Sequence, residues 1–265
     1  MKRLKYLVVL SLLFMGCFNY ISSLDEPSAC LVYGPYEQNE TCMNHQSLPN
    51  GIGEEKFVYL TFDDGPSKNT EKILDILDDH GIKGTFFLIG QSLYTVPNSD
   101  YLLNRMLDTG HYIGLHSMTH DADTIYFGEN SAQHFIDEML EVQALITSIT
   151  GGFESQLCRA PYGTYNNFSA DHIDLVAGSN FNCWDWNIDS NDWKVSSVSE
   201  LIDNIKLETE NVRHSSHLVV LLHEKDITVE SLPAIIDYYS QLGYTFLVYR
   251  SEEHFPLNFF NHPNF

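Results

Sequence analysis

The stretch KFVYLTFDDGP (residues 56–66) places an apolar segment directly before two aspartates and a turn. The composition of KFVYLTF (56–62) predicts a strand, and Gly65 with Pro66 predicts a sharp turn after it. Asp63 and Asp64 repel one another unless a cation offsets their charge. The pair therefore indicates either a metal site, with one aspartate bound and the other free as a base, or a turn in which Asp-Gly-Pro has only a geometric role.

Strands and helices alternate from this stretch onward. Further strands are predicted at 84–90, 112–116, 155–163, 180–189, 217–224 and 244–250, and helices at 69–81, 99–110, 131–151, 197–210 and 229–243. Seven strands that alternate with helices predict a parallel α/β architecture, either a closed or nearly closed barrel or an open doubly wound sheet. Both arrangements place functional residues at the carboxyl ends of the strands.

Other segments flank this main domain, which spans residues 56–250. Residues 1–23 are predicted to be a signal peptide, because a basic start precedes the apolar run of residues 6–18. That run is shorter than the roughly 20 residues that span a bilayer, so a short membrane anchor is the weaker alternative and we expect no transmembrane anchor. Residues 24–55 are predicted to be a loop-like extension broken by prolines and glycines, and residues 251–265 a C-terminal tail.

Charge and cysteine content restrict the partners and the compartment. The formal net charge of −22 repels phosphate backbones, so no nucleic-acid partner is expected. Such acidity suits a neutral or cationic substrate, or serves solubility alone. Removing the signal peptide leaves Cys30, Cys42, Cys158 and Cys183, which allow three pairings in an oxidising compartment. We expect Cys30–Cys42 and Cys158–Cys183.

HSMTH (residues 116–120) follows the third predicted strand. On a helical turn, positions i and i+4 point the same way, so His116 and His120 could reach one ion. Two histidines and one carboxylate form a common metal set that leaves room for water. A chain with 12 histidines also produces such pairs by chance. Asp64, at the end of another strand, makes the metal interpretation the stronger one.

Two later stretches carry further candidates. In RAPYG (159–163), Arg159 could hold a carboxylate ionised, and the backbone N–H of Tyr162 could face an oxyanion; the alternative is a structural ion pair and a turn. In LLH (221–223), His223 is either a core residue or an acid whose pKa Asp192 raises.

Aromatic residues beside these stretches allow two interpretations. Trp193, in DSNDW (189–193), and Tyr162 could stack on a sugar ring. Trp184 and Trp186 are expected to pack in the core, as most tryptophans do.

These five stretches, in this order, resemble the polysaccharide deacetylases, the carbohydrate esterase family that includes chitin deacetylases and peptidoglycan N-acetylglucosamine deacetylases. TFDDGP (61–66) and the H-S-x-x-H pattern are the specific motifs, and RAPYG, DSNDW and LLH fit R-x-P-Y, D-x-x-D-W and L-x-H. The resemblance covers nearly all of residues 56–250. It implies a single catalytic domain with a distorted (β/α) barrel of about seven parallel strands.

The resemblance also implies a role for each matching residue. A divalent metal, Zn²⁺ first and Co²⁺ as an alternative, would be held by Asp64, His116 and His120. Asp63 would be the general base, paired with Arg159. His223 would be the general acid, supported by Asp192. The Tyr162 N–H would bind the oxyanion, and Trp193 and Leu221 would line the pocket for the acetyl methyl group. Glu224 follows His223 where relatives often carry aspartate.

The implied function is removal of N-acetyl groups from N-acetylglucosamine residues of a polysaccharide, with release of acetate. Chitin or chitooligosaccharides are the first expected substrate and peptidoglycan the second. We expect a secreted monomer, extracellular or associated with a cell wall. The alternatives are a catalytically weak glycan-binding protein on the same scaffold, and a zinc-stabilised structural protein, which would need a closed site of four protein ligands.

Overall fold

The computed structural model describes residues 55–263. The predicted signal peptide, nearly all of the extension and the Cys30–Cys42 pair lie outside this range. The strands are β1 (Phe57–Gly65), β2 (Thr85–Leu88), β3 (Tyr112–Leu115), β4 (Leu157–Cys158), β5 (Asn182–Cys183), β6 (Ile188–Asp189), β7 (His217–His223) and β8 (Thr245–Leu247). The helices are α1 (Thr70–Asp79), α2 (Gly90–Thr95), α3 (Ser99–Asp108), α4 (Ala122–Tyr126), α5 (Ser131–Thr150), α6 (Ala170–Ala177), α7 (Val198–Asn211) and α8 (Asp226–Gln241), followed by the 3₁₀ turn η2 (Ser251–Glu253).

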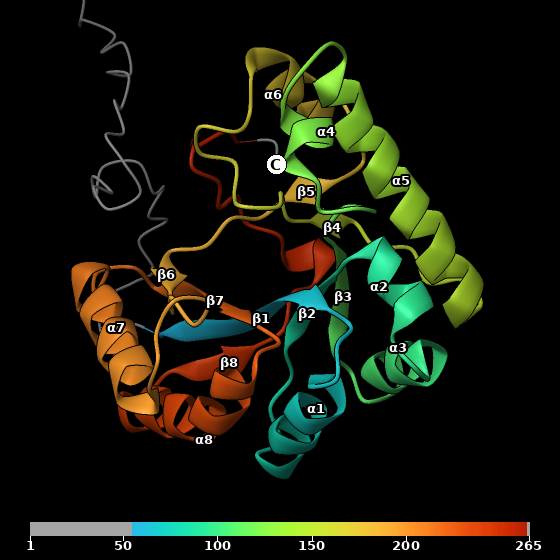
Figure 1. Ribbon diagram of the computed structural model, residues 1–265. Coiled ribbons are helices and arrows are strands. Elements are labelled where there is room, and N and C mark those ends of the chain that lie inside the picture. Colours follow the sequence, from blue (N-terminus) through green and yellow to red (C-terminus); the bar gives the residue numbers. More distant parts are fainter. Residues whose placement is uncertain (1–54, 264–265) are drawn as a thin grey trace, which may run out of the picture. The chain divides into compact units, whose positions relative to one another are not determined.

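The strands form one parallel sheet in the order β5-β4-β3-β2-β1-β7-β6, and β8 pairs with β1. One side of β1 pairs with β7 along residues 57–63. Its other side pairs first with β8 and then with β2. The helices lie around the outside of this curled sheet (Figure 1). Among the described residues no strand pairing joins β5 to β6, so the barrel is open at this seam, and the expectation of a distorted (β/α) barrel is confirmed.

Side chains of β1 point alternately to the two faces of the sheet, and this decides which of them face the inside of the barrel. Side chains in a strand point to opposite faces in turn. Val58, Leu60 and Phe62 belong to the large apolar core, whereas Tyr59 belongs to a second core cluster with Phe87, Leu157, Trp184, Val219, Tyr249 and Leu257. By the same alternation, Thr61 and Asp63 share the face of Tyr59. Asp63 therefore stands at the carboxyl end of the inward-facing row.

The prediction of a single strand over residues 180–189 is wrong in one respect, because the structure has two short strands there, β5 and β6. The guanidinium of Arg159 donates through Nε to the carbonyl of Trp184 (2.9 Å) and through Nη2 to the carbonyl of Asp185 (3.0 Å). The N–H of Asp185 donates instead to the carbonyl of Leu257 in the tail (2.8 Å). The strand is therefore interrupted between Trp184, whose N–H still donates to Cys158 of β4, and Asn187, whose N–H donates to Val219 of β7. The short helices α2, α4 and α6 were not expected from the periodicity.

The predicted Cys158–Cys183 disulfide is absent, since both residues are free and fully buried. They are direct neighbours on the parallel strands β4 and β5. Their side chains leave the sheet side by side into the large core, where a thiol packs as a small apolar group. None of the described helices is long and apolar enough to cross a membrane.

Candidate functional site

The two adjacent aspartates have different partners. Asp63 is almost fully buried, and its Oδ1 accepts a hydrogen bond from Nη1 of Arg159 at 2.8 Å. Asp64 has a φ of +67°, a left-handed conformation that is uncommon away from glycine. Its buried Oδ1 accepts no hydrogen bond from a described residue and lies 3.6 Å from Nε2 of His116 and 3.3 Å from Nε2 of His120. The chain thus separates an arginine-bound carboxylate from one that faces two imidazoles.

His116 and His120 converge as expected, but not on a helical turn. Residues 116–121 form an irregular loop in which Ser117 and His120 have φ values of +63° and +59°. Nδ1–H of His116 donates to the carbonyl of Arg159 at 2.8 Å, which leaves Nε2 with a free lone pair. Burial, with the nearby His116 second, lowers the pKa of His120, so its imidazole is neutral at neutral pH.

The donor atoms of this corner fit a divalent metal. Within residues 55–263, Asp64, His116 and His120 offer ligand atoms that all lie within 4.8 Å of one another. Oδ1 of Asp64 is a buried anionic atom without a hydrogen bond, which is costly unless a cation lies beside it. Two imidazoles and a carboxylate suit zinc and leave coordination positions open. We call these three residues the metal corner.

Glu138 on α5 holds the loop that carries the two histidines. Its buried Oε2 accepts the backbone N–H groups of Met118 and Thr119 at 3.0 Å each, and its Oε1 accepts the hydroxyl of Thr119 at 2.8 Å. Glu138 was not among the residues predicted from the sequence. Its signal was an acidic residue on the apolar face of the helix, in the helical register of Phe135 and Val142.

Arg159 is fully buried and orients Asp63. Its Nη1 donates to the hydroxyl of Thr61 at 2.7 Å as well as to Asp63, while Nε and Nη2 bind the carbonyls of Trp184 and Asp185. A guanidinium held at four points has little freedom to rotate. It therefore keeps the Asp63 carboxylate fixed in direction.

His223 and Asp192 form a second buried pair, at the end of β7. Nδ1 of His223 lies 2.6 Å from Oδ1 of Asp192, whose Oδ2 accepts the backbone N–H of His223 at 2.6 Å and the hydroxyl of Thr228 at 2.5 Å. Burial opposes the imidazolium, but the hydrogen bond and charge of Asp192 outweigh it and raise the pKa of His223 to about 9. His223 is next to Asp63 in the register of β7 and β1.

The three remaining candidates, Tyr162, Leu221 and Trp193, differ in how much of each residue is exposed to solvent. Tyr162 is 61% exposed, and its ring is 4.6 Å from that of His120, with its hydroxyl donating to the carbonyl of His120 at 3.3 Å. Leu221 is buried on β7, two residues before His223. Trp193 is 57% exposed, and the ammonium of Lys194 lies over its ring. The structure thus brings Tyr162 to the metal corner and leaves Trp193 at the surface.

Glu224 is buried beneath the turn after β1. The hydroxyl of Thr70 donates to its Oε2, and a Cβ on Gly65 would meet its Oε1. Burial raises the pKa of Glu224 to about 7, although hydrogen bonds from Thr70 and Ser67 oppose the shift. Glu224, which stands where relatives often carry aspartate, therefore packs closely against Gly65 and Thr70 in the turn after β1.

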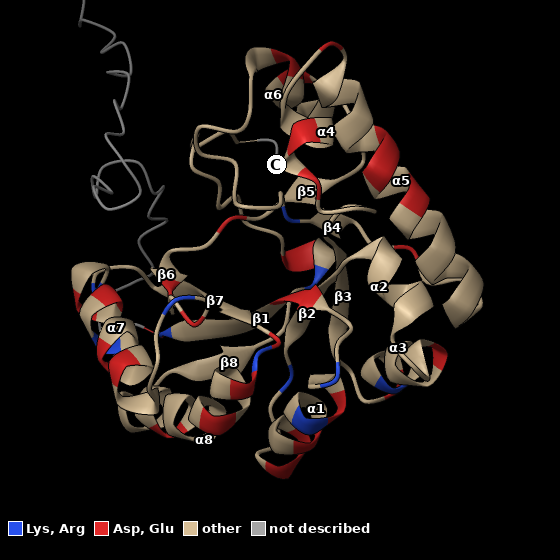
Figure 2. Cartoon of the chain, in the orientation of Figure 1, with Lys and Arg blue, Asp and Glu red and all other residues tan. Residues whose placement is uncertain are grey.

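Acidic residues are distributed over the strand ends and the outer helices, with fewer basic ones among them (Figure 2). The site combines an arginine-bound aspartate, three converging side chains that could hold a metal and a histidine–aspartate pair. All of them come from the carboxyl ends of parallel strands or the loops that follow. These features define an α/β protein whose strand ends could hold a divalent metal beside an arginine-bound carboxylate and a histidine–aspartate pair.

The chain belongs to the polysaccharide deacetylase family. The family model for polysaccharide deacetylases matches residues 50–175. A peptidoglycan-N-acetylglucosamine deacetylase of Bacillus cereus is 35% identical over 233 residues, covering 85% of this chain and 81% of that protein. The peptidoglycan-N-acetylglucosamine deacetylase PgdA of Listeria monocytogenes is 31% identical over 194 residues, covering 72% of this chain and 38% of that protein.

Solved structures agree with this assignment. The polysaccharide deacetylase Bc1974 from Bacillus cereus superposes with a TM-score of 0.71 at 36% identity, covering 80% of this chain and all of that chain (100%). The catalytic domain of a peptidoglycan N-acetylglucosamine deacetylase from Eubacterium rectale gives a TM-score of 0.67 at 28% identity, with 82% and 99% covered. The family resemblance of the sequence is therefore confirmed.

Proposed function

We propose that this protein is a metal-dependent hydrolase that removes N-acetyl groups from N-acetylglucosamine residues of a polysaccharide and releases acetate. One observation carries the proposal: Asp63 is bound by Arg159, whereas Asp64 faces His116 and His120. A single strand end thus supplies a proton acceptor and an anionic metal ligand side by side. Amide hydrolysis needs both, because water must lose a proton as it attacks a poorly electrophilic carbonyl.

Each remaining step is assigned to a residue of the chain. Zn²⁺ or Co²⁺, held by the metal corner, would supply Lewis acidity to the substrate carbonyl and to the attacking water. Asp63 accepts the proton of that water, and Arg159 keeps its carboxylate aimed. The backbone N–H of Tyr162 donates to the developing oxyanion. His223, protonated at neutral pH because of Asp192, gives its proton to the leaving nitrogen.

The products follow from this proton balance. The C–N bond breaks, the acyl carbon leaves as acetate, and the sugar keeps an amine that is protonated at neutral pH. Leu221 and Trp193 are proposed to line the pocket for the acetyl methyl group. Leu221 supports this role by its position two residues before His223.

We propose a chitin-type polymer of β-1,4-linked N-acetylglucosamine as the first substrate. The net charge of −22 supports a neutral glycan, because every second sugar of a peptidoglycan strand bears a carboxylate or a peptide. Peptidoglycan is the second candidate, favoured by the names of the relatives from Bacillus cereus and Listeria monocytogenes. Either polymer places the protein outside the cell, in keeping with the proposed signal peptide at residues 1–23.

The test is acetate release from two substrates by the purified, zinc-loaded protein. Fully N-acetylated chitooligosaccharides and peptidoglycan fragments are incubated separately, and the loss of acetyl groups is followed by mass spectrometry. We expect release from chitooligosaccharides that stops with a chelator and returns with Zn²⁺. His116→Ala should lose both bound zinc and activity, and His80→Ala, an exposed histidine on the far end of α1, is the control. Retention on chitin without any acetate release would instead support a glycan-binding protein.

A further inference from the structure

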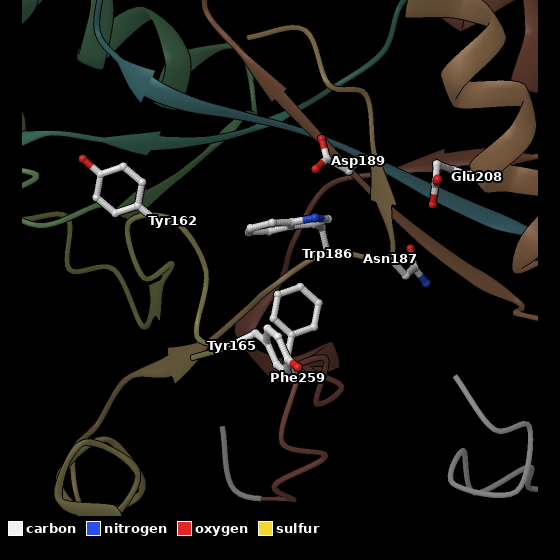
Figure 3. Close-up of a pocket in the computed structure, with 7 residues that line it drawn as sticks. All are labelled: Tyr162, Tyr165, Trp186, Asn187, Asp189, Glu208 and Phe259. Carbon is white, nitrogen blue, oxygen red and sulfur yellow. The ribbon is translucent and has the colours of Figure 1, made fainter. Parts of the chain in front are cut away.

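A pocket of about 160 Å³ lies at the open seam of the barrel, where residues 184–187 bridge β5 and β6. Figure 3 shows its wall, which combines four aromatic rings with two carboxylates. The rings belong to Tyr162, Tyr165, Trp186 and Phe259, and the carboxylates to Asp189 and Glu208. Tyr162 also packs against His120 in the metal corner, so the pocket adjoins the proposed catalytic centre.

Trp186 provides a fixed aromatic surface in this pocket. It packs against the second core cluster but is only partly buried, so the expectation of core packing holds in part, whereas Trp184 is in the core as expected. Phe259 meets its indole edge-to-face, with ring centroids 5.2 Å apart, and a Cβ on Gly163 would approach the indole to 2.8 Å. In Figure 3 Asp189 lies on one side of the indole plane and Phe259 on the other. A rigid, half-open aromatic surface suits the C–H face of a pyranose ring.

The two carboxylates have few partners. Oδ1 of Asp189 accepts the backbone N–H of Asn191 at 2.8 Å, and among the described residues its Oδ2 accepts no hydrogen bond. The carboxylate of Glu208 accepts none from residues 55–263 either. Burial raises the pKa of both groups, and the charge of Asp189 raises that of Glu208 further; the nearby charges of His223 and Lys194 for Asp189, and of Lys194 for Glu208, oppose this only in part. Because no lysine or arginine lines the pocket, a cationic ligand would relieve this repulsion.

We propose that the pocket is a subsite for a glucosamine residue of the substrate chain, with its protonated amine bound by Asp189 and Glu208 and its ring on Trp186. The inference rests on the proposed function, since glucosamine is the sugar that deacetylation leaves in the chain. N-acetylglucosamine has no charge to offer these carboxylates, and the carboxylate of a muramic acid is repelled by them. A chain that already carries one glucosamine is therefore a better substrate than a fully acetylated chain.

The first test compares kcat/KM for acetate release from fully acetylated chitotetraose and from tetramers with one glucosamine at each defined position. Wild-type protein should prefer at least one of the mixed tetramers about fivefold or more. In Asp189→Asn/Glu208→Gln the ratio should fall to about one. Glu208→Gln alone should lower it part of the way, since this change removes a charge without removing a hydrogen bond. Glu210→Gln, an exposed change on the same helix, is the matched control and should keep the ratio.

The second test needs no turnover. Binding of a fully deacetylated chitosan trimer to zinc-loaded protein is measured by calorimetry, and the double variant should bind roughly tenfold more weakly, the loss expected for a charge-assisted contact. Acetate release without any preference for mixed tetramers, or a preference retained by the double variant, overturns the subsite and leaves the deacetylase function standing. Absence of acetate release from every substrate overturns the proposed function. In that case equal trimer binding by wild type and double variant overturns the subsite as well.

Discussion

The metal corner and the seam pocket lie side by side but are built in different ways. The metal corner comes from two strand-end loops, and buried partners hold it: Glu138 binds the loop of the histidines, and Arg159 binds Asp63 and receives the His116 N–H through its carbonyl. The pocket is formed by four segments, including α7 and the tail. Its two carboxylates accept few hydrogen bonds from the described residues. Hydrogen-bonded partners therefore fix the reacting groups in place, whereas the two carboxylates at the open seam are left available to bind a ligand.

The largest effect should follow from Asp63→Asn. This change removes the proposed base and should lower kcat for acetate release by about 10²–10⁴-fold, the usual contribution of a positioned base. Zinc should stay bound, because Asp64 and both histidines remain. Kinetics and metal content are measured on the same preparation. Asp79→Asn, an exposed change at the end of α1, serves as the control. Wild-type turnover by Asp63→Asn would mean that another group takes the proton.

Glu138→Gln tests whether the metal corner depends on its buried support. A glutamine amide can still accept the two N–H groups through its oxygen, but it is uncharged and turns an N–H donor toward the Thr119 hydroxyl, so the charge-assisted hydrogen bonds to the loop are lost. We expect zinc affinity to fall by about 10–100-fold, as for other changes behind metal ligands. Competition with a chelating dye measures this affinity. Glu141→Gln, on the exposed face of α5, should bind zinc as wild type does. An unchanged zinc affinity in Glu138→Gln would show that the loop of residues 116–121 keeps its conformation without the charge of Glu138.

Asp192→Asn should change the pH dependence. Asp192 raises the pKa of His223 to about 9, so the imidazole stays protonated up to about that pH. As the pH rises above this value, His223 loses its proton and can no longer donate it to the leaving nitrogen. Without the carboxylate the pKa falls, and the alkaline limb of kcat/KM should move to lower pH. Rates across a pH series show the shift, with thermal unfolding as a check that the fold persists. An alkaline limb at the wild-type position would exclude His223 as the proton donor.

The smallest effect is expected from Phe259→Ala at the seam. Losing its contact with Trp186 removes an aromatic pair of about 0.5–1.5 kcal/mol, which corresponds to a change of roughly two- to tenfold in kcat/KM for oligomers. Zinc affinity should be the same as in the wild type, because the pocket shares no metal ligand. Phe260→Ala, the neighbouring exposed phenylalanine, controls for loosening of the tail. A loss of zinc affinity in Phe259→Ala would show that the two regions act as one unit.

Most of the metal corner could be predicted because its residues follow strands directly. The carboxyl ends of parallel strands meet at one edge, so Asp64 and the HSMTH histidines were expected to lie together, and they do. The expected helical turn was wrong, since left-handed residues at Ser117 and His120 turn the loop instead. Glu138 was missed, although an acid on an apolar helix face was a visible signal.

The seam could not be predicted in the same way. Residues 180–189 have the composition of one strand, yet Arg159 takes two carbonyls from the middle of it. Trp186 was expected to pack in the core like most tryptophans. It packs against the second core cluster but stays partly exposed, beside the broken strand and the tail. The predicted Cys158–Cys183 disulfide was right only in that the two thiols lie near each other. The spacing of cysteines in a sequence specifies neither the redox compartment nor the side-chain directions that a disulfide needs.

The amino-acid sequence was sufficient to predict the parallel α/β architecture, the strand ends that carry the site residues and the family of the chain. Hydrophobic periodicity and short motifs carry this information because they record burial and turns over a few residues. The structure confirms the pairing of Arg159 with Asp63 that the family resemblance implied. The opening of the barrel between β5 and β6, and the pocket that the tail completes there, became visible only in the folded chain. These outcomes depend on buried polar partners far apart in the chain, and no local pattern specifies which partners will meet.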